Sequence, residues 1–106
     1  MAWVYLFVAG LLEVVWAFFM KKSDGFSKPF ESTITIVAMI ASFWLLSMAM
    51  RVLPLGTSYT IWTGIGAVGA FILGIIWLGE DASPIRVVAA LLILAGLALM
   101  RLSSTA

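Results

Sequence analysis

The sequence has 106 residues, of which 64% are hydrophobic and only 10% are charged, whereas a soluble domain carries about 25% charged residues. The chain has six Lys and Arg residues and five Asp and Glu residues, so its net charge is +1. This near-neutral charge excludes the basic surface that nucleic-acid binding requires. The absence of Cys and His excludes disulfides, thiolate or imidazole metal sites, and Ser–His or Cys–His catalysis.

Long apolar runs follow one another along the chain, and a transmembrane helix needs about 20 such residues. They predict an all-α membrane protein with a single domain over residues 1–106. The predicted membrane-spanning helices cover residues 2–20, 32–50, 57–78 and 84–101. The segments between them are short and contain Pro, Gly and charged residues, which are typical of helix ends and turns. Around the fourth helix, we expect the side chains of Arg86 and Arg101 to extend toward the lipid headgroups.

The Lys and Arg residues give only a weak signal for the orientation in the membrane. If all predicted helices cross the membrane, one side carries Arg51 and Arg101. The other side carries Lys21, Lys22, Lys28 and Arg86. Positively charged loops favour the cytoplasmic side. Two interpretations stay open: the first loop is cytoplasmic, or the chain inserts in both orientations.

The first predicted helix contains Glu13, the one acidic or basic residue that we expect deep in the membrane. An acidic side chain there costs roughly 2.5–3.5 kcal/mol, and such residues usually face a cavity or a partner. The carboxyl is either protonated or ionised beside a cation or water, and protons and cations then compete for it. The alternative is a permanently neutral Glu that hydrogen-bonds another helix. One acid without a base, nucleophile or metal ligand predicts no enzyme activity, and we expect no metal and no cofactor.

The residues near Glu13 predict the lining of a site. Gly10 is small enough for another helix to approach, and the indole N–H of Trp16 can donate to the carboxylate. In the second helix, Ser42 lies at a similar depth near Met39 and Phe43, and its hydroxyl can also hydrogen-bond Glu13. The alternative for Trp16 is ordinary packing, and the alternative for Ser42 is a hydrogen bond to its own helix backbone.

The third predicted helix contains Tyr59 and Trp62 on one face. Aromatic faces attract cations by about 0.5–2 kcal/mol, so this pair predicts a wall of a cation site; the alternative is a packed or lipid-facing pair. The glycines Gly64, Gly66 and Gly69 form a G-x-G-x-x-G pattern, but they lie in an uncharged apolar run and not after a strand, which excludes a dinucleotide site. We interpret them as small residues that let this helix bend or slide.

The fourth predicted helix carries Ala89, Ile93 and Gly96 on one stripe. Small residues at a spacing of seven favour a contact between helices of two chains. Packing within the chain is the alternative.

Together these residues resemble the small multidrug resistance family of proton-coupled exporters over nearly the whole length. The most specific stretches are residues 10–17, 54–69 and 79–86. Within the family, Trp16 followed by Ala17, and the stretch 62–69, are similar to the guanidinium exporter branch. The multidrug branch has small residues after its Glu.

The resemblance implies an antiparallel homodimer with dual topology in the bacterial inner membrane. It also implies exchange of guanidinium or a small guanidinyl cation for protons by alternating access. Glu13 of both subunits would bind substrate and protons, and Trp16, Ser42, Tyr59 and Trp62 would line or organise the site. The chain departs from the family at Ala89, where the interface motif usually begins with Gly.

Two other functions stay open. An exporter of polyaromatic or quaternary ammonium compounds would use Glu13 with Tyr59 and Trp62 as a cation–π cage. A passive channel or a non-transporting assembly subunit would use Glu13 only as a structural contact.

Overall fold

A computed structural model describes residues 1–103, which form helices α1 (Ala2–Lys22), α2 (Pro29–Ala49), α3 (Leu55–Leu78) and α4 (Pro84–Ser103). Each helix is long and apolar enough to cross a membrane. The prediction of an all-α protein with four such helices is confirmed for this part of the chain. The last three residues of the predicted domain, 104–106, lie outside the described residues.

The helix boundaries differ slightly from the predicted ones, and prolines account for most of the difference. Helix α2 begins at Pro29 and not at residue 32, because the fixed φ of proline suits the first turn of a helix. Helix α3 begins directly after Pro54 and ends before Gly79, whose left-handed φ of 69° is easily adopted without a Cβ. Helix α4 continues to Ser103.

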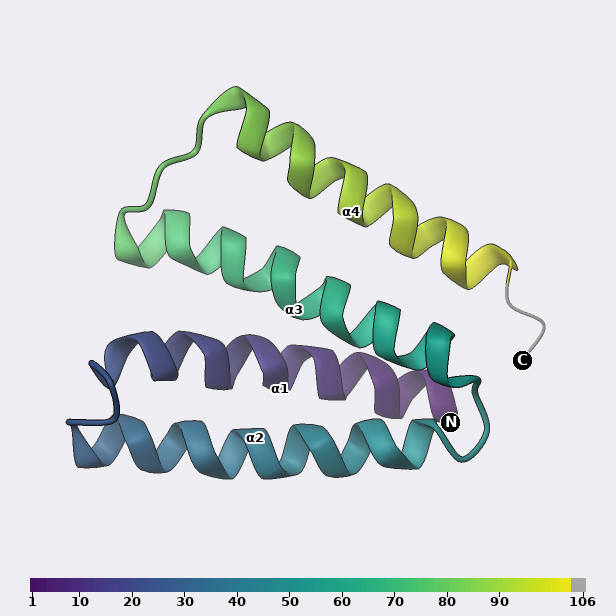
Figure 1. The fold of residues 1–106 in the computed structure, drawn as a ribbon, viewed down its shortest axis with the longest axis horizontal. Helices are drawn as coiled ribbons and strands as arrows, with labels where there is room; N and C mark the ends of the chain where they lie inside the picture. Colours follow the sequence, from purple (N-terminus) through teal and green to yellow (C-terminus); the bar gives the residue numbers. More distant parts are fainter. Residues whose placement is uncertain (104–106) are drawn as a thin grey trace.

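The helices lie side by side in a flat row, in the order α2, α1, α3, α4 (Figure 1). The molecule measures 42 × 34 × 16 Å along its principal axes. Helix α1 is in the middle and packs along both α2 and α3, whereas α4 packs along α3 alone. A single flat row of helices does not enclose a path across a bilayer.

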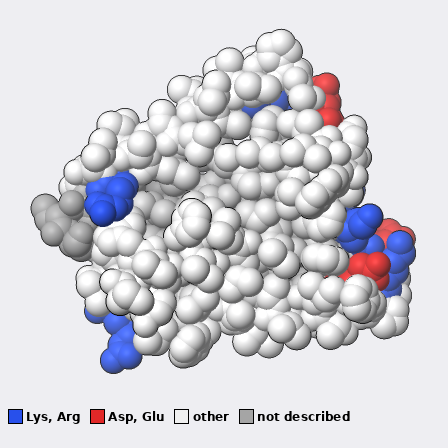
Figure 2. All heavy atoms as spheres, turned by 180° about the vertical axis from the view of Figure 1, so that it is seen from behind, with Lys and Arg blue, Asp and Glu red and all other residues white. Residues whose placement is uncertain are grey.

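Charged side chains lie at the two ends of the helices, and Figure 2 shows an uncharged surface between them. One end carries Lys21, Lys22, Asp24, Lys28, Glu31, Glu80, Asp81 and Arg86, and the other carries Arg51 and Arg101. The uncharged surface is the part that lipid tails can cover. Among residues 1–103, Glu13 is the only Asp, Glu, Lys or Arg within this zone.

The core is small and lies where α1, α2 and α3 meet. Its buried residues are Leu6, Ala9, Leu46, Ala49, Leu53, Ile61 and Trp62. Helix α4 contributes no buried residue over Pro84–Ser103. It is therefore a peripheral helix whose position depends on a few contacts, and these contacts are described below.

Candidate functional site

The side chain of Glu13 lies between α1 and α3, against Gly66. A Cβ built on Gly66 would overlap Oε1, Cδ and Cγ of Glu13, so the absence of a side chain at Gly66 makes the space for the carboxyl. The Glu13 side chain is half-buried, and its Oε1 is inaccessible and has no hydrogen-bond partner among the described residues. A buried oxygen without a donor gains free energy from a proton or a cation that binds to it.

Other glycines allow close contact between the helices. Three of them each lie against a side chain of a neighbouring helix: Gly10 against Ile65, Gly69 against Val14, and Gly64 against Leu97. Helix α3 is continuous from Leu55 to Leu78, and Gly64, Gly66 and Gly69 lie where α4 or α1 packs against it. Gly10 thus sets the distance between α1 and α3 next to Glu13, and the bending or sliding of α3 at its glycines stays a prediction.

Ser42 joins three helices through its hydroxyl group. The buried Oγ donates to the carbonyl of Ala9 in α1 at 2.7 Å and accepts the indole N–H of Trp62 in α3 at 3.0 Å. The Ala9 carbonyl is also the regular helix acceptor for the backbone N–H of Glu13. The hydroxyl that we predicted to bond the Glu13 carboxylate bonds this carbonyl instead, because α1 and α2 pack closely at Ala9, which is fully buried.

We expect Ser42→Ala to lower the free energy of unfolding by about 1 kcal/mol, because it leaves the buried Trp62 N–H without an acceptor. Ser47→Ala is the matched control, since Ser47 is exposed on the same helix and bonds only the Trp44 carbonyl. We expect this control to change stability by less than about 0.5 kcal/mol. Unfolding in a denaturing detergent measures both variants, and equal stability of the two would contradict the role of Ser42.

Four aromatic rings form a row across α1, α2 and α3. The ring centroids are 6.2 Å apart for Trp16 and Phe43, 5.8 Å for Phe43 and Trp62, and 5.7 Å for Trp62 and Tyr59. Trp62 is buried, whereas its two neighbours in the row, Phe43 and Tyr59, are exposed. Such ring faces can hold an organic cation.

The structure places Phe43, which the sequence put near Ser42, between the rings of Trp16 and Trp62, and it leaves one predicted hydrogen bond unformed. Phe43 follows Ser42 and lies one helical turn after Met39. The indole Nε1 of Trp16 is buried and, like Oε1 of Glu13, has no hydrogen-bond partner among residues 1–103. The predicted donation from Trp16 to Glu13 is therefore absent in this conformation.

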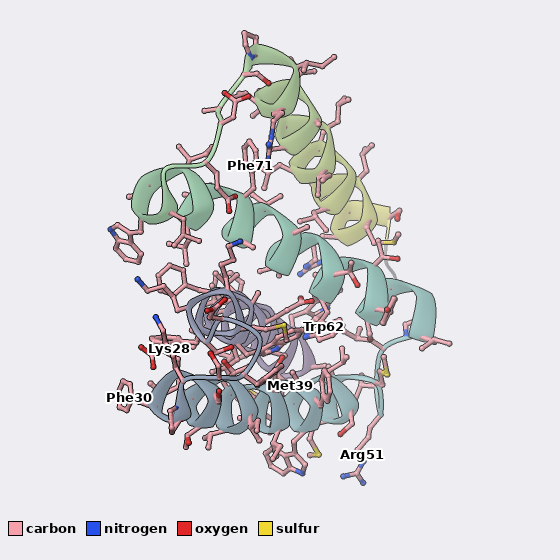
Figure 3. The ribbon with its side chains drawn as sticks, turned by 60° about the vertical axis from the view of Figure 1, so that its left-hand side comes forward. Lys28, Phe30, Met39, Arg51, Trp62 and Phe71 are labelled. Carbon is pink, nitrogen blue, oxygen red and sulfur yellow. The ribbon has the colours of Figure 1, made fainter. Side chains whose placement is uncertain are left out.

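The candidate site lies in the middle of the molecule. Figure 3 shows Met39 and Trp62 between the helices, with Lys28 and Arg51 at opposite ends. Met39 is partly buried on α2. No group of three or more acidic side chains among the described residues could hold a metal ion.

The predicted contact stripe of α4 lies open to the surroundings. Ala89, Ile93 and Gly96 are exposed, and nothing lies within 4 Å of a Cβ built on Gly96. Ile93 and Gly96 line a groove of about 530 Å³ between α3 and α4, together with Tyr59 and Ala67. Packing within the chain leaves this stripe uncovered, and a contact with a second chain stays a prediction.

Comparison with known proteins gives consistent matches. The model of the family described as Small Multidrug Resistance protein matches residues 1–93. A guanidinium exporter from Yersinia pseudotuberculosis is 57% identical over 104 residues, which are 98% of this chain and 100% of that protein. Guanidinium exporters from Citrobacter freundii and Salmonella typhimurium are each 56% identical over 104 residues, which are 98% of this chain and 99% of each relative.

Proposed function

The chain belongs to the small multidrug resistance family, and from this membership we propose that it exports guanidinium or small guanidinyl cations in exchange for protons. The membership confirms the resemblance seen in the sequence and makes the chain a multi-pass membrane transport protein. The relatives that are 56–57% identical are named guanidinium exporters, which supports the substrate class. We further propose the bacterial inner membrane as its location.

The observation that carries the proposal is the position of Glu13, whose carboxyl lies against Gly66 in an uncharged zone and has a buried oxygen without a hydrogen-bond partner among the described residues. A guanidinium ion is planar and donates paired N–H bonds that match the two oxygens of a carboxylate. A proton on the same carboxyl removes the negative charge and with it the attraction for the cation. Guanidinium and protons therefore compete for Glu13.

The neighbouring residues have roles that follow from their contacts. Trp62 forms a wall of the site and fixes Ser42, which in turn holds the α1 backbone at Ala9. Trp16 offers an unused N–H that can orient the carboxylate when the helices move. Tyr59 lies beside Trp62 on α3 and is exposed, so a cation that binds Tyr59 would contact α3 directly.

We propose that the transporter is an antiparallel homodimer with dual topology. Two copies in opposite orientations would form the inverted repeat that other transporters use to build two equivalent gates. The weak Lys and Arg bias suits insertion in both orientations. The exposed stripe of Ala89, Ile93 and Gly96 would form the contact between subunits, and Glu13 of both subunits would face a common site.

Transport would proceed by alternating access. Helix α3 carries Tyr59, Trp62 and Gly66, so one movement of α3 changes both the aromatic wall and the space around the carboxyl. The dimer would change its open side only when guanidinium or protons occupy the Glu13 pair. This rule couples the export of the cation to the entry of protons.

Flux into liposomes tests the proposal. With protons more concentrated inside, wild-type protein should accumulate labelled guanidinium, and a protonophore should abolish the accumulation. An aromatic quaternary ammonium ion in place of guanidinium tests the multidrug alternative. Accumulation of only the aromatic ion, or guanidinium flux that ignores the proton gradient, would contradict the proposed function.

A further inference from the structure

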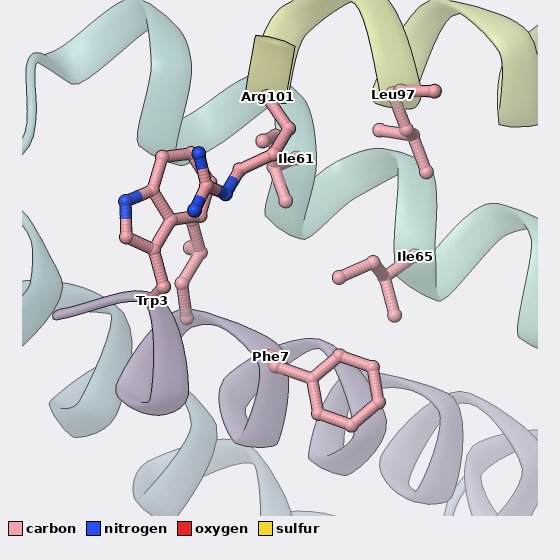
Figure 4. A pocket seen from close by; sticks show the side chains of 8 residues that line it. Trp3, Phe7, Ile61, Ile65, Leu97 and Arg101 are labelled. Atoms are coloured by element: carbon pink, nitrogen blue, oxygen red, sulfur yellow. The ribbon is translucent and has the colours of Figure 1, made fainter. Parts of the chain in front are cut away.

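Arg101, near the end of α4, stacks on Trp3, near the start of α1. The guanidinium carbon lies 4.4 Å from the centroid of the Trp3 ring, and Figure 4 shows the two side chains closing one end of a groove. This groove of about 270 Å³ lies between α1, α3 and α4, and its walls include Phe7, Ile65 and Leu97. The contact thus connects the outermost helix of the row to the central one.

Within a single chain, helix α4 is held in place by few other contacts. None of its residues is buried over Pro84–Ser103, and it packs along α3 alone. Leu97 lies against Gly64 of α3, and Leu97 and Met100 pack against the core. Arg101 follows Leu97 by one helical turn and lies on the same face, from which it reaches past α3 to α1. Helix α3 is therefore held between α1 and α4 at this level.

The part of α3 that is held in this way carries the candidate site. Gly64, which receives Leu97, lies between Trp62 and Gly66 in the sequence. Trp62 donates to Ser42, and Gly66 gives space to the Glu13 carboxyl. A displacement of α3 away from α1 would alter both contacts at once.

We propose that Arg101 is a positioning residue for cation binding: its contact with Trp3 holds α4 against α3 and thereby keeps Trp62 and Gly66 in place beside Glu13. This inference rests on the proposed function. In lipid, apolar contacts between helices compete with equally apolar contacts to lipid tails. A stacked guanidinium supplies a directional attraction that lipid tails cannot supply, and it stays charged at every relevant pH.

Arg86 provides a matched control on the same helix. Its guanidinium carbon lies 5.4 Å from the centroid of the Phe71 ring, and Phe71 belongs to α3. This second contact connects α4 to α3 without reaching α1. Its loss should leave the packing of α3 on α1 unchanged.

The test compares guanidinium affinity in purified protein. Arg101→Gln should weaken the binding of guanidinium about fivefold, and Trp3→Leu should weaken it at least as much, because Trp3 also packs against the core. The double variant should lose no more than Trp3→Leu alone, because that variant already removes the contact with Arg101. Arg101→Lys keeps a cation over the ring and should retain most of the affinity, and Arg86→Gln should bind as the wild type does.

A structural readout keeps this inference separate from the proposed function. The chain has no Cys, so cysteines introduced at Phe7 and Ala98, which both line the groove, can be joined by a short bifunctional thiol reagent without background. Arg101→Gln should reduce this cross-linking, and Arg86→Gln should not. If wild-type protein does not transport guanidinium, the proposed function fails while cross-linking still tests the contact. Unchanged affinity and cross-linking in Arg101→Gln, or fully additive losses in the double variant, would overturn the positioning role.

Discussion

Glu13→Gln should abolish proton-driven guanidinium accumulation, with a loss of at least about 100-fold in the initial rate. The amide of Gln has nearly the shape of the carboxyl but carries no negative charge and does not take up and release a proton. It therefore loses two charge-assisted hydrogen bonds to guanidinium, which are about twice as strong as neutral ones, and it loses the proton exchange itself. Uptake of labelled guanidinium into acid-loaded liposomes measures the effect.

The controls for this variant separate the site from the fold. Asp81→Asn removes one negative charge from an exposed position between α3 and α4 and should leave transport unchanged. Glu13→Asp keeps the charge but moves it toward the α1 backbone, and we expect an intermediate rate. If Glu13→Gln still carries guanidinium at the wild-type rate, Glu13 is a structural contact and the exporter mechanism is wrong.

Gly66→Ala should weaken guanidinium binding by about 10-fold to 100-fold. The added Cβ would overlap Oε1, Cδ and Cγ of Glu13, so either the carboxyl leaves its position or α3 moves away from α1. A displacement of about 1 Å in a binding site can cost this much. Alanine favours a helix over glycine by about 1 kcal/mol, so the loss cannot come from a weaker α3. Titration of purified protein with guanidinium measures the affinity.

Gly56→Ala is the matched control for this substitution. Gly56 lies in the same helix, and nothing lies within 4 Å of a Cβ built at that position. We expect wild-type affinity for this variant. Wild-type affinity in Gly66→Ala as well would show that the position of the Glu13 carboxyl does not depend on the space at Gly66.

The helices and the key carboxyl could be predicted from the sequence because both depend on local signals. Apolar runs bounded by Pro54 and Pro84 define where helices begin, and a lone acid such as Glu13 is conspicuous in a run of apolar residues. The order of the helices in the row could not be predicted. An apolar run predicts the length of a helix. It does not predict which other helix packs against it, because one apolar face can pack against any other.

The hydrogen bonds and glycine contacts of the site needed the structure. The sequence gives the depth of Ser42 in the membrane, but its actual acceptor is a backbone carbonyl of α1, which has no signature in the sequence. The glycine at position 66 could be recognised as small, yet only the packing of α3 on α1 shows which side chain it accommodates. The side chain of Arg101, expected to extend toward the headgroups, stacks on the ring of Trp3 from the other end of the chain.

The release of protons when guanidinium binds tests the central claim most directly. Purified protein in a weakly buffered solution with a pH indicator is titrated with guanidinium at a series of pH values. We expect wild-type protein to release protons on binding and to bind more weakly as the pH falls, and Glu13→Gln to release none. Binding of guanidinium with the same affinity at every pH, without proton release, would contradict the claim that guanidinium and protons compete for the Glu13 carboxyl.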